Sequence, residues 1–323
     1  MKIITDLDAI AAPFNDPCVT IGNFDGVHLG HQMLFGKVVE RARALRGTGV
    51  AITFEPHPLR VLRPDGGLKL ISTYDQKVEL IGKAGIDLLL VLPFTREFAA
   101  TPAETFVDEV MLGRLGMKEL VVGYDYAFGR GRQGDIAFLR EQGRLKGFPV
   151  MVVEPFYVEE MLVSSTRIRE LVGEGRMRDV KKLLGRWYQM HGEVRQGQRR
   201  GGPVVGFPTA NLHLAEEDLC PRHGVYVTQV VCEGQCYGGV LNIGYNPTFG
   251  GRTLSAETHI FNFNRDIYGK HIKINLLRFL RGECKFSGPA ELAEQIREDI
   301  RQAHEVLAEA AGELRLSCRE AAG

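Results

Sequence analysis

The two halves of the chain have different patterns of hydrophobic residues. Of all features of the sequence, this difference constrains the possible folds most. Short apolar runs alternate with longer amphipathic stretches in the first half, whereas extended runs rich in Val, Ile, Tyr and Thr follow residue 185. Alternating strands and helices predict a doubly wound parallel sheet, because parallel neighbours need crossover connections. Successive extended runs broken by Gly and Asn-Pro predict an antiparallel sheet or barrel. A length of 323 residues also suits two domains, which we place at 1–184 and 185–323.

The expected elements follow from the spacing of apolar residues. In the first half, strands are expected at 18–21, 50–54, 87–92, 119–122 and 149–153, and helices at 31–46, 74–84, 102–115 and 134–145. In the second half, extended runs lie at 226–232, 237–243, 256–263 and 271–279, and a helix is expected at 289–311.

Charge and cysteine content narrow the function classes. Forty basic residues balance forty acidic ones, which argues against nucleic-acid or anionic-membrane partners, so any phosphate site must be local. The N-terminal residues lack an apolar signal region and no run of eighteen apolar residues occurs, so neither secretion nor membrane insertion is indicated. We interpret the scattered cysteines as free thiols in a reducing cytoplasm. They are Cys18, Cys220, Cys232, Cys236, Cys284 and Cys318.

The strongest local signal is Gly22-Asn-Phe-Asp-Gly-Val-His-Leu-Gly-His-Gln, which follows the first expected strand and enters the first long helix. Glycines let the backbone approach phosphate oxygens, and a helix N-terminus favours negative charge. His28 and His31 lie one turn apart and can aim at one phosphoryl group. For His-x-x-His alone, a zinc pair or two solvated histidines in a turn would be the commoner explanation, but the position after the first strand favours the phosphate site.

A second anion site is indicated by Val163-Ser-Ser-Thr-Arg-Ile-Arg, just beyond the fifth expected strand. Hydroxyls and arginines at a helix start suit phosphates or departing pyrophosphate. An ordinary helix cap with surface arginines is the simpler alternative.

In the second half, Gly206-Phe-Pro-Thr-Ala-Asn-Leu follows a glycine- and arginine-rich segment, 197–202. The oxygens of Thr209 and Asn211 are hard ligands suited to Mg²⁺ carried with ATP, although a Pro-Thr-Ala-Asn segment alone is usually a turn.

Taken together, the first-half motifs resemble the His-x-Gly-His nucleotidyltransferases, and more closely the FMN adenylyltransferase domain of bacterial bifunctional riboflavin kinase/FAD synthetases. The segments that carry the resemblance are 22–32, 53–58, 122–132 and 164–169. The resemblance implies that His28 and His31 stabilise the transferring phosphate, while Asp125 and Phe128 lie near the flavin. It assigns nucleotide binding to Gly22, Asn23, Asp25, Ser165, Thr166 and Arg169. A polar, hairpin-like loop would explain 125–132 as well, and His57 stays outside the catalytic set.

The second-half segments 241–249, 257–260, 266–270 and 278–286 look like the riboflavin kinase domain, a Greek-key β-barrel. On this resemblance Glu257 accepts the proton of the riboflavin 5′-hydroxyl, Thr209 and Asn211 hold Mg-ATP, and Arg281 contacts flavin. A solvent-facing strand glutamate is the alternative for Glu257. The loop 202–206 lacks an arginine common in this family, so Arg199 or Arg200 would have to replace it at ATP.

The resemblance therefore implies two reactions that need Mg²⁺: riboflavin and ATP give FMN, and FMN and ATP give FAD and pyrophosphate. Two rival hypotheses are a barrel that binds single-stranded nucleic acid, which the balanced charge disfavours, and a flavin-responsive regulator with degenerate sites. Because the candidate site residues are all present, the enzyme is the favoured hypothesis. The sequence leaves a homo-oligomer open.

Overall fold

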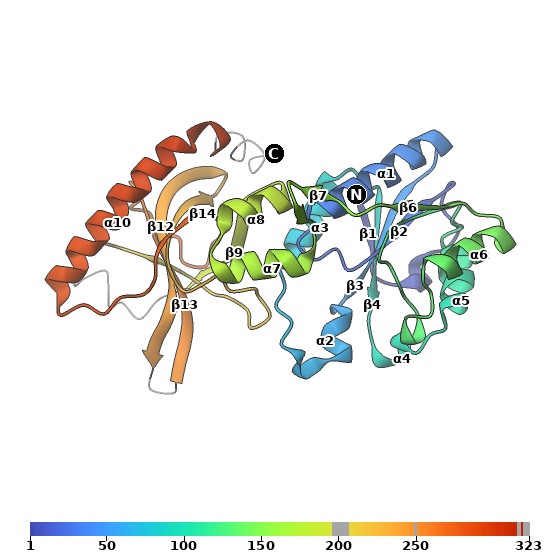
Figure 1. Cartoon of the computed structure of the whole chain (residues 1–323), viewed down its shortest axis with the longest axis horizontal. Coiled ribbons are helices and arrows are strands. Elements are labelled where there is room, and N and C mark those ends of the chain that lie inside the picture. The colour runs from blue at the N-terminus through green and yellow to red at the C-terminus, as the bar shows by residue number, and fades with distance from the viewer. Residues whose placement is uncertain (196–206, 249–250, 315–317, 319–323) are drawn as a thin grey trace. The chain divides into compact units, whose positions relative to one another are not determined.

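A computed structural model of the chain describes residues 1–195, 207–248, 251–314 and 318. The chain divides into two compact units, Met1–Ser165 and Thr166–Gly323 (Figure 1). Three features of the sequence lie outside the described residues: the glycine- and arginine-rich segment 197–202, the loop 202–206 and most of the tail after 314.

The first unit is built on a six-stranded sheet in the order β1-β4-β3-β2-β5-β6, and every neighbouring pair is parallel. The strands are β1 (Lys2–Ile4), β2 (Cys18–Ile21), β3 (Gly49–Glu55), β4 (Leu88–Pro93), β5 (Glu119–Gly123) and β6 (Val150–Val153). This confirms the doubly wound prediction. The sequence did not reveal β1, because three residues at a sheet edge carry too little periodicity.

Both faces of this sheet are buried. Along β4, Leu88, Leu90 and Leu92 belong to one apolar cluster, while Leu89 and Val91 belong to another on the opposite face. Such continuous apolar strands are typical of parallel sheets covered by helices on both sides. The longer helices are α1 (Leu29–Leu45), α3 (Tyr74–Lys83), α6 (Ile136–Lys146) and a π-helical segment, η3 (Phe106–Arg114). The shorter ones are η1 (Leu7–Ala9), α2 (Pro58–Leu62), η2 (Pro64–Gly66), α4 (Arg96–Ala99), α5 (Ala103–Thr105) and η4 (Arg130–Arg132), and β7 (Tyr157–Val158) pairs with β8 (Met161–Leu162).

The second unit contains a closed antiparallel barrel in the order β10-β13-β12-β11-β14-β9. Its strands are β9 (Tyr188–Arg195), β10 (Ala210–Leu212), β11 (Gly224–Cys232), β12 (Gln235–Thr248), β13 (Gly251–Ile260) and β14 (His271–Arg281). Three consecutive strands, β11 to β13, lie side by side, and β14 returns next to β11, which is the Greek-key order. The predicted fold of this half is confirmed.

Helices cover the outside of the barrel. The unit also contains α7 (Ser165–Glu174), α8 (Met177–Leu184) and the long α10 (Pro289–Glu309). Ala303 and Val306 of α10 share an apolar cluster with Val225 and Val227 of β11 and Leu277 of β14. Burial of this apolar face is what holds an amphipathic helix of this length to the barrel.

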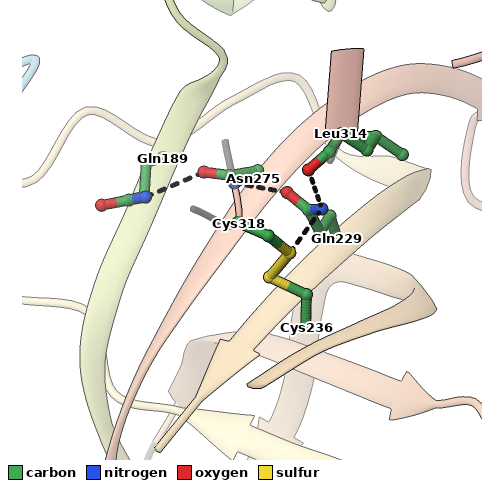
Figure 2. The surroundings of a disulfide bond; sticks show 6 residues. All are labelled: Gln189, Gln229, Cys236, Asn275, Leu314 and Cys318. Carbon is green, nitrogen blue, oxygen red and sulfur yellow. Dashed lines mark hydrogen bonds between the residues drawn. A yellow bond between two sulfur atoms is a disulfide. The ribbon is translucent and has the colours of Figure 1, made fainter. Parts of the chain in front are cut away.

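One prediction was wrong: not all cysteines are free thiols. Cys236, at the start of β12, forms a disulfide with Cys318, with Cα atoms 6.2 Å apart (Figure 2). The pairing spans 82 residues, and such a distant approach depends on the path of the chain rather than on cysteine spacing. Cys18, Cys220, Cys232 and Cys284 are free. Burial raises the pKa of Cys18 to about 12, so its thiol stays protonated at neutral pH.

Within the part of the chain that the structure describes, no helix is both long and apolar enough to cross a bilayer.

Candidate active sites

Two of the segments predicted for the first unit follow the carboxyl ends of β2 and β5, which are neighbours in the sheet. After β2 the chain runs to β3 and β4 on one side, and it later crosses to β5 on the other. Ligands of open parallel sheets bind where the strand order reverses in this way. The loop after β2 carries His28, and the loop after β5 carries Asp125. The fold therefore places both predicted segments at the same edge of the sheet, after neighbouring strands.

His28 caps the N-terminus of α1. Its Nδ1 accepts a hydrogen bond from the backbone N–H of His31, at 3.3 Å. In a neutral imidazole with Nδ1 as acceptor, the proton is on Nε2, so this nitrogen is the one able to donate to a phosphate oxygen. The His28 and His31 rings are stacked, with centroids 3.6 Å apart and planes 17° from parallel. Gly30 leaves room for this arrangement, since a Cβ there would lie 3.3 Å from His28 Nδ1.

The loop between β2 and α1 adopts an unusual backbone conformation. Phe24, Gly26 and Val27 have φ values of 52°, 77° and 39°. Side-chain-bearing residues avoid this left-handed region, which costs roughly 1–3 kcal/mol for each strained residue and is found mostly at functional sites. The strain at Val27 implies that surrounding contacts fix the loop.

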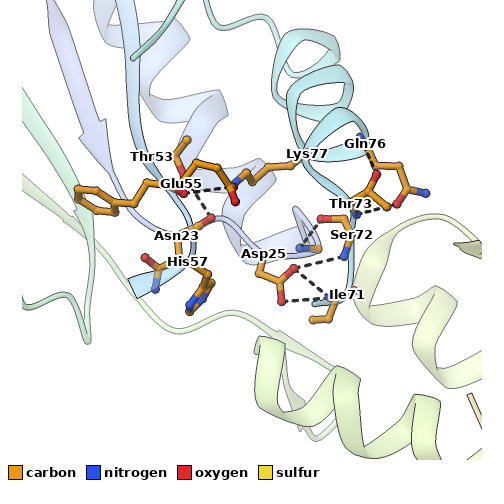
Figure 3. Close-up of polar contacts among 12 residues, drawn as sticks. Asn23, Asp25, Thr53, Glu55, His57, Ile71, Ser72, Thr73, Gln76 and Lys77 are labelled. Atoms are coloured by element: carbon orange, nitrogen blue, oxygen red, sulfur yellow. Dashed lines mark hydrogen bonds and ion pairs between the residues drawn. The ribbon is translucent and has the colours of Figure 1, made fainter. Parts of the chain in front are cut away.

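Asp25 supplies these contacts. Its buried carboxylate accepts hydrogen bonds from the backbone N–H of Ile71, at 3.0 and 3.1 Å, and of Ser72, at 3.3 Å (Figure 3). The Ser72 hydroxyl accepts from Gly26 N–H at 3.1 Å. Asp25 therefore holds the loop, and its part in nucleotide binding stays a prediction. Asn23 lies beside it, and its carbonyl accepts from the hydroxyl of Thr53 at 3.2 Å.

Two buried polar residues near the end of β3, His57 and Lys77, were not chosen as site residues from the sequence. His57 caps α2 by accepting from Leu59 N–H at 3.2 Å and lies near Asn23 in Figure 3. Lys77 of α3 is buried, and its Nζ lies 3.4 Å from both the Phe54 carbonyl oxygen and Glu55 Oε2. A lysine within an otherwise apolar helix face was the only sequence signal for this contact.

The serine-rich segment is divided between the units. The Ser165 hydroxyl donates to the Asp25 carbonyl at 3.0 Å, which joins this segment to the loop after β2. Thr166 and Arg169 follow on α7 and belong to the second unit, with Thr166 exposed and Arg169 half-buried. Nucleotide binding by these two residues stays a prediction.

The flavin prediction for Asp125 and Phe128 falls on a loop closed by an antiparallel bridge between Phe128 and Gly134. Asp125 is exposed. Phe128 stacks on Tyr126, with ring centroids 5.5 Å apart, and packs against Phe106. The Tyr126 hydroxyl is buried without a hydrogen-bond partner among the described residues, and burial raises its pKa well above the ordinary value. The bridge agrees with the hairpin-like loop considered as the alternative.

In the second unit, the candidate kinase residues form a row across three strands. Glu257 of β13 is directly opposite Asn211 of β10 on one side and Asn242 of β12 on the other. Directly opposed residues project from the same face of a sheet, with Cβ atoms about 4.5–5.5 Å apart. Thr209 immediately precedes β10. Asn242 was not predicted as a site residue, because only the strand register brings it beside Glu257.

Arg281, predicted to contact flavin, is engaged with α10. Its Nε and Nη2 donate to the buried carboxylate of Asp299, at 2.9 Å to Oδ1 and 2.7 Å to Oδ2. These hydrogen bonds raise the pKa of Arg281 above its ordinary value. The ion pair joins the end of β14 to the helix, and a flavin contact by Arg281 stays a prediction.

The donor set in this row fits a metal that arrives with a nucleotide rather than a preformed metal cage. Among the described residues, no group of three or more His, Cys, Asp or Glu side chains could hold a metal ion. Mg²⁺ usually takes only one or two protein oxygens and keeps waters and phosphate oxygens as its other ligands. The hydroxyl of Thr209 and the amide oxygen of Asn211 meet that requirement.

Comparison with known proteins identifies both halves. A family described as FAD synthetase matches residues 12–167, and one described as riboflavin kinase matches residues 184–307. The chain belongs to the bifunctional riboflavin kinase/FMN adenylyltransferase family. The family member of Escherichia coli K12 is 34% identical over 94% of this chain and 97% of its own. That of Listeria monocytogenes is 35% identical over 87% of this chain and 89% of its own.

A solved structure shares the whole architecture. A crystal structure named as a macrolide-efflux protein from Streptococcus pneumoniae has a TM-score of 0.83 and 32% identity, and covers 94% of this chain and 98% of that chain. The likeness supports the two-unit fold, and the efflux named there is said of that protein alone. As a member of the bifunctional family, the chain is a riboflavin kinase and an FMN adenylyltransferase that makes FMN and FAD.

Proposed function

We propose that the first unit transfers the adenylyl group at the loop after β2. A phosphate oxygen of FMN attacks the α-phosphorus of ATP, and pyrophosphate leaves. His28 Nε2–H and the stacked His31 ring stabilise charge on the α-phosphate, and Gly22 and Asn23 let the backbone approach the nucleotide. The hydrogen bond that fixes His28 Nδ1 as an acceptor supports this role. Oriented donors of this kind act mainly on the developing charge of the transition state.

For the second unit we propose that Glu257 takes the proton of the riboflavin 5′-hydroxyl as its oxygen attacks the γ-phosphorus of ATP. Thr209 and Asn211 hold the Mg²⁺ that accompanies the nucleotide, and this metal neutralises phosphate charge when bound. The observation that carries the proposal is the strand register, which sets Asn211 directly beside Glu257. A base must be within hydrogen-bond reach of its proton, and this row brings base and nucleotide ligand together.

The remaining assignments follow from the same division. Ser165, Thr166 and Arg169 bind the triphosphate, and Asp125, Phe128 and Arg281 contact flavins. We place the functional boundary at 184/185, and the riboflavin kinase match over residues 184–307 supports this position. A fragment that begins at Leu184 and phosphorylates riboflavin without making FAD would support it. The enzyme acts in the cytoplasm, where ATP is made, and a homo-oligomer is compatible with the two separate sites.

Glu257→Gln tests the kinase mechanism, because glutamine keeps the size of the side chain and removes the base. With riboflavin and Mg-ATP, FMN formation should fall by about 10²- to 10⁴-fold. FAD formation from supplied FMN should be unchanged. Both products are measured by chromatography, with the exposed Glu305→Gln as the matched control. If Glu257→Gln phosphorylates riboflavin at the parent rate, Glu257 is not the base.

A further inference from the structure

The carboxylate of Glu257 receives a hydrogen bond from a residue on its own strand. The Ser255 hydroxyl donates to Glu257 Oε1 at 2.9 Å, and both side chains are half-buried. The two residues are separated by one position on β13, so they project from the same face of the strand. Ser255 therefore lies next to the row that Asn211, Glu257 and Asn242 form across the barrel.

A general base needs its acceptor oxygen in a defined place. The strand register fixes the backbone of Glu257, but a glutamate side chain has three rotatable bonds that this register leaves open. A hydrogen bond to one carboxylate oxygen selects one orientation, and it is stronger than a neutral hydrogen bond because the acceptor is charged. Misplacement of a catalytic group by about 1 Å can cost on the order of 10²-fold in rate.

A second carboxylate lies on the other side of Ser255. Ser255 is directly opposite Gly244 of β12, and a Cβ at Gly244 would lie 2.1 Å from Glu283 Oε1. The space left by this glycine is thus occupied by the Glu283 side chain. A serine hydroxyl has a single proton to donate, and in the structure Ser255 donates it to Glu257. An experiment on Ser255 has to separate an effect through Glu257 from an effect through Glu283.

We propose that Ser255 is a positioning residue for riboflavin phosphorylation, which holds the Glu257 carboxylate in place to receive the substrate proton. The proposal rests on the proposed role of Glu257. In that step the O–H bond of the riboflavin 5′-hydroxyl breaks and its proton passes to Glu257. The hydroxyl oxygen bonds to the γ-phosphorus, and the bond to the bridging oxygen breaks as ADP leaves. Ser255 keeps its own proton throughout.

The test measures kcat and KM for riboflavin phosphorylation by the full-length chain. Ser255→Ala should lower kcat by about 10- to 100-fold, the usual effect of losing one hydrogen bond to a charged group. The KM values for riboflavin and ATP should change less than about 2-fold, because the proposed hydrogen bond orients the base and does not bind either substrate. Ser255→Thr keeps the hydroxyl and should recover most of the parent kcat. Ser287→Ala is the matched control, since Ser287 donates to Glu291 at 2.7 Å on the exposed start of α10.

Adding Ser255→Ala to Glu257→Gln identifies the path of the effect. If Ser255 acts through Glu257, the double variant should be no slower than Glu257→Gln alone, because residues that act as a unit are not additive. If Ser255→Ala lowers kcat in the Glu257→Gln background by the same factor as in the parent, the proposal is overturned, and the effect acts through Glu283 or through the fold. A parent kcat in Ser255→Ala, beside an impaired Glu257→Gln, would also overturn it. An unimpaired Glu257→Gln would instead remove the base on which the proposal rests.

Discussion

The two candidate sites are assembled in different ways. In the first unit, one strained loop and the first turn of α1 carry His28, His31 and the Asp25 carboxylate that holds the loop, all within ten residues of sequence. In the second unit, Asn211, Asn242 and Glu257 come from three strands and meet only through the barrel register. A contiguous loop can be recognised from its sequence, whereas a row across strands is visible only after folding. The comparison also implies that damage to one site should leave the other reaction intact.

Of three further variants, His28→Ala, Gly30→Ala and Cys318→Ser, the first is expected to have the largest effect on catalysis. FAD formation should fall by about 10²- to 10³-fold, the usual cost of losing one oriented donor to a developing oxyanion. FMN formation should stay at the parent rate, because Glu257 and its neighbours belong to the other unit. Both rates are measured by separating riboflavin, FMN and FAD, with the exposed His213→Ala as control. Equal losses of FMN and FAD formation in His28→Ala would show that the two reactions do not depend on independent sites.

A smaller effect is expected for Gly30→Ala. The added Cβ would lie 3.3 Å from the His28 ring, a contact tight enough to displace it by a few tenths of an ångström. FAD formation should fall about 10-fold, less than the 10² expected for a displacement of 1 Å. Gly36, on the same helix, has nothing within 4 Å of a built Cβ, so Gly36→Ala should keep full activity. Similar rates for the two variants would show that the His28 ring position does not limit adenylyl transfer.

The smallest effect on catalysis is expected for Cys318→Ser, which opens the disulfide to Cys236. The free energy of unfolding of the second unit should fall by about 2–4 kcal/mol, the typical contribution of a disulfide. Trp187 is the sole tryptophan of the chain and is buried in this unit, so its fluorescence during urea unfolding reports the change. FAD formation from FMN should not change.

Cys284→Ser, at an exposed free thiol, is the control for the disulfide variant. Reducing the parent protein with a dithiol should reproduce the unfolding curve of Cys318→Ser. An unfolding midpoint for Cys318→Ser equal to that of the parent would show that the disulfide contributes nothing to the stability of the barrel.

Local pattern was enough to predict most of the longer strands and helices. β2 begins and ends at the predicted residues. The ends of α1 and α3 differ from the prediction by at most two residues, and those of the four barrel strands by up to five. The segment 102–115 is an exception, since a helix was expected and α5 is followed by the π-helical η3. A Cβ at Gly113 would lie 2.9 Å from the Asp108 carbonyl oxygen, so glycine permits the wider turn. The spacing of apolar residues distinguishes poorly between α-helical and π-helical turns.

Contacts between residues that are far apart in the chain could not be predicted from the sequence. It indicated Asp25 and Arg281 as ligand-contact residues, but not that the backbone of Ile71 and the carboxylate of Asp299 would be their partners. It gave no reason to pair Cys236 with Cys318, or to place Ser255 and Asn242 beside Glu257. Each of these depends on register or chain path, which are set by packing of the whole unit.

The central claim, that two independent sites act in sequence, is tested most directly by mixing two variants. His28→Ala should convert riboflavin to FMN and stop there, while Glu257→Gln should adenylylate FMN but make almost none from riboflavin. With riboflavin and Mg-ATP, the mixture should produce FAD, because FMN released by the first variant is a substrate for the second. The account predicts far more FAD from the mixture than the sum from the separate variants. A mixture that makes no more FAD than that sum would contradict it.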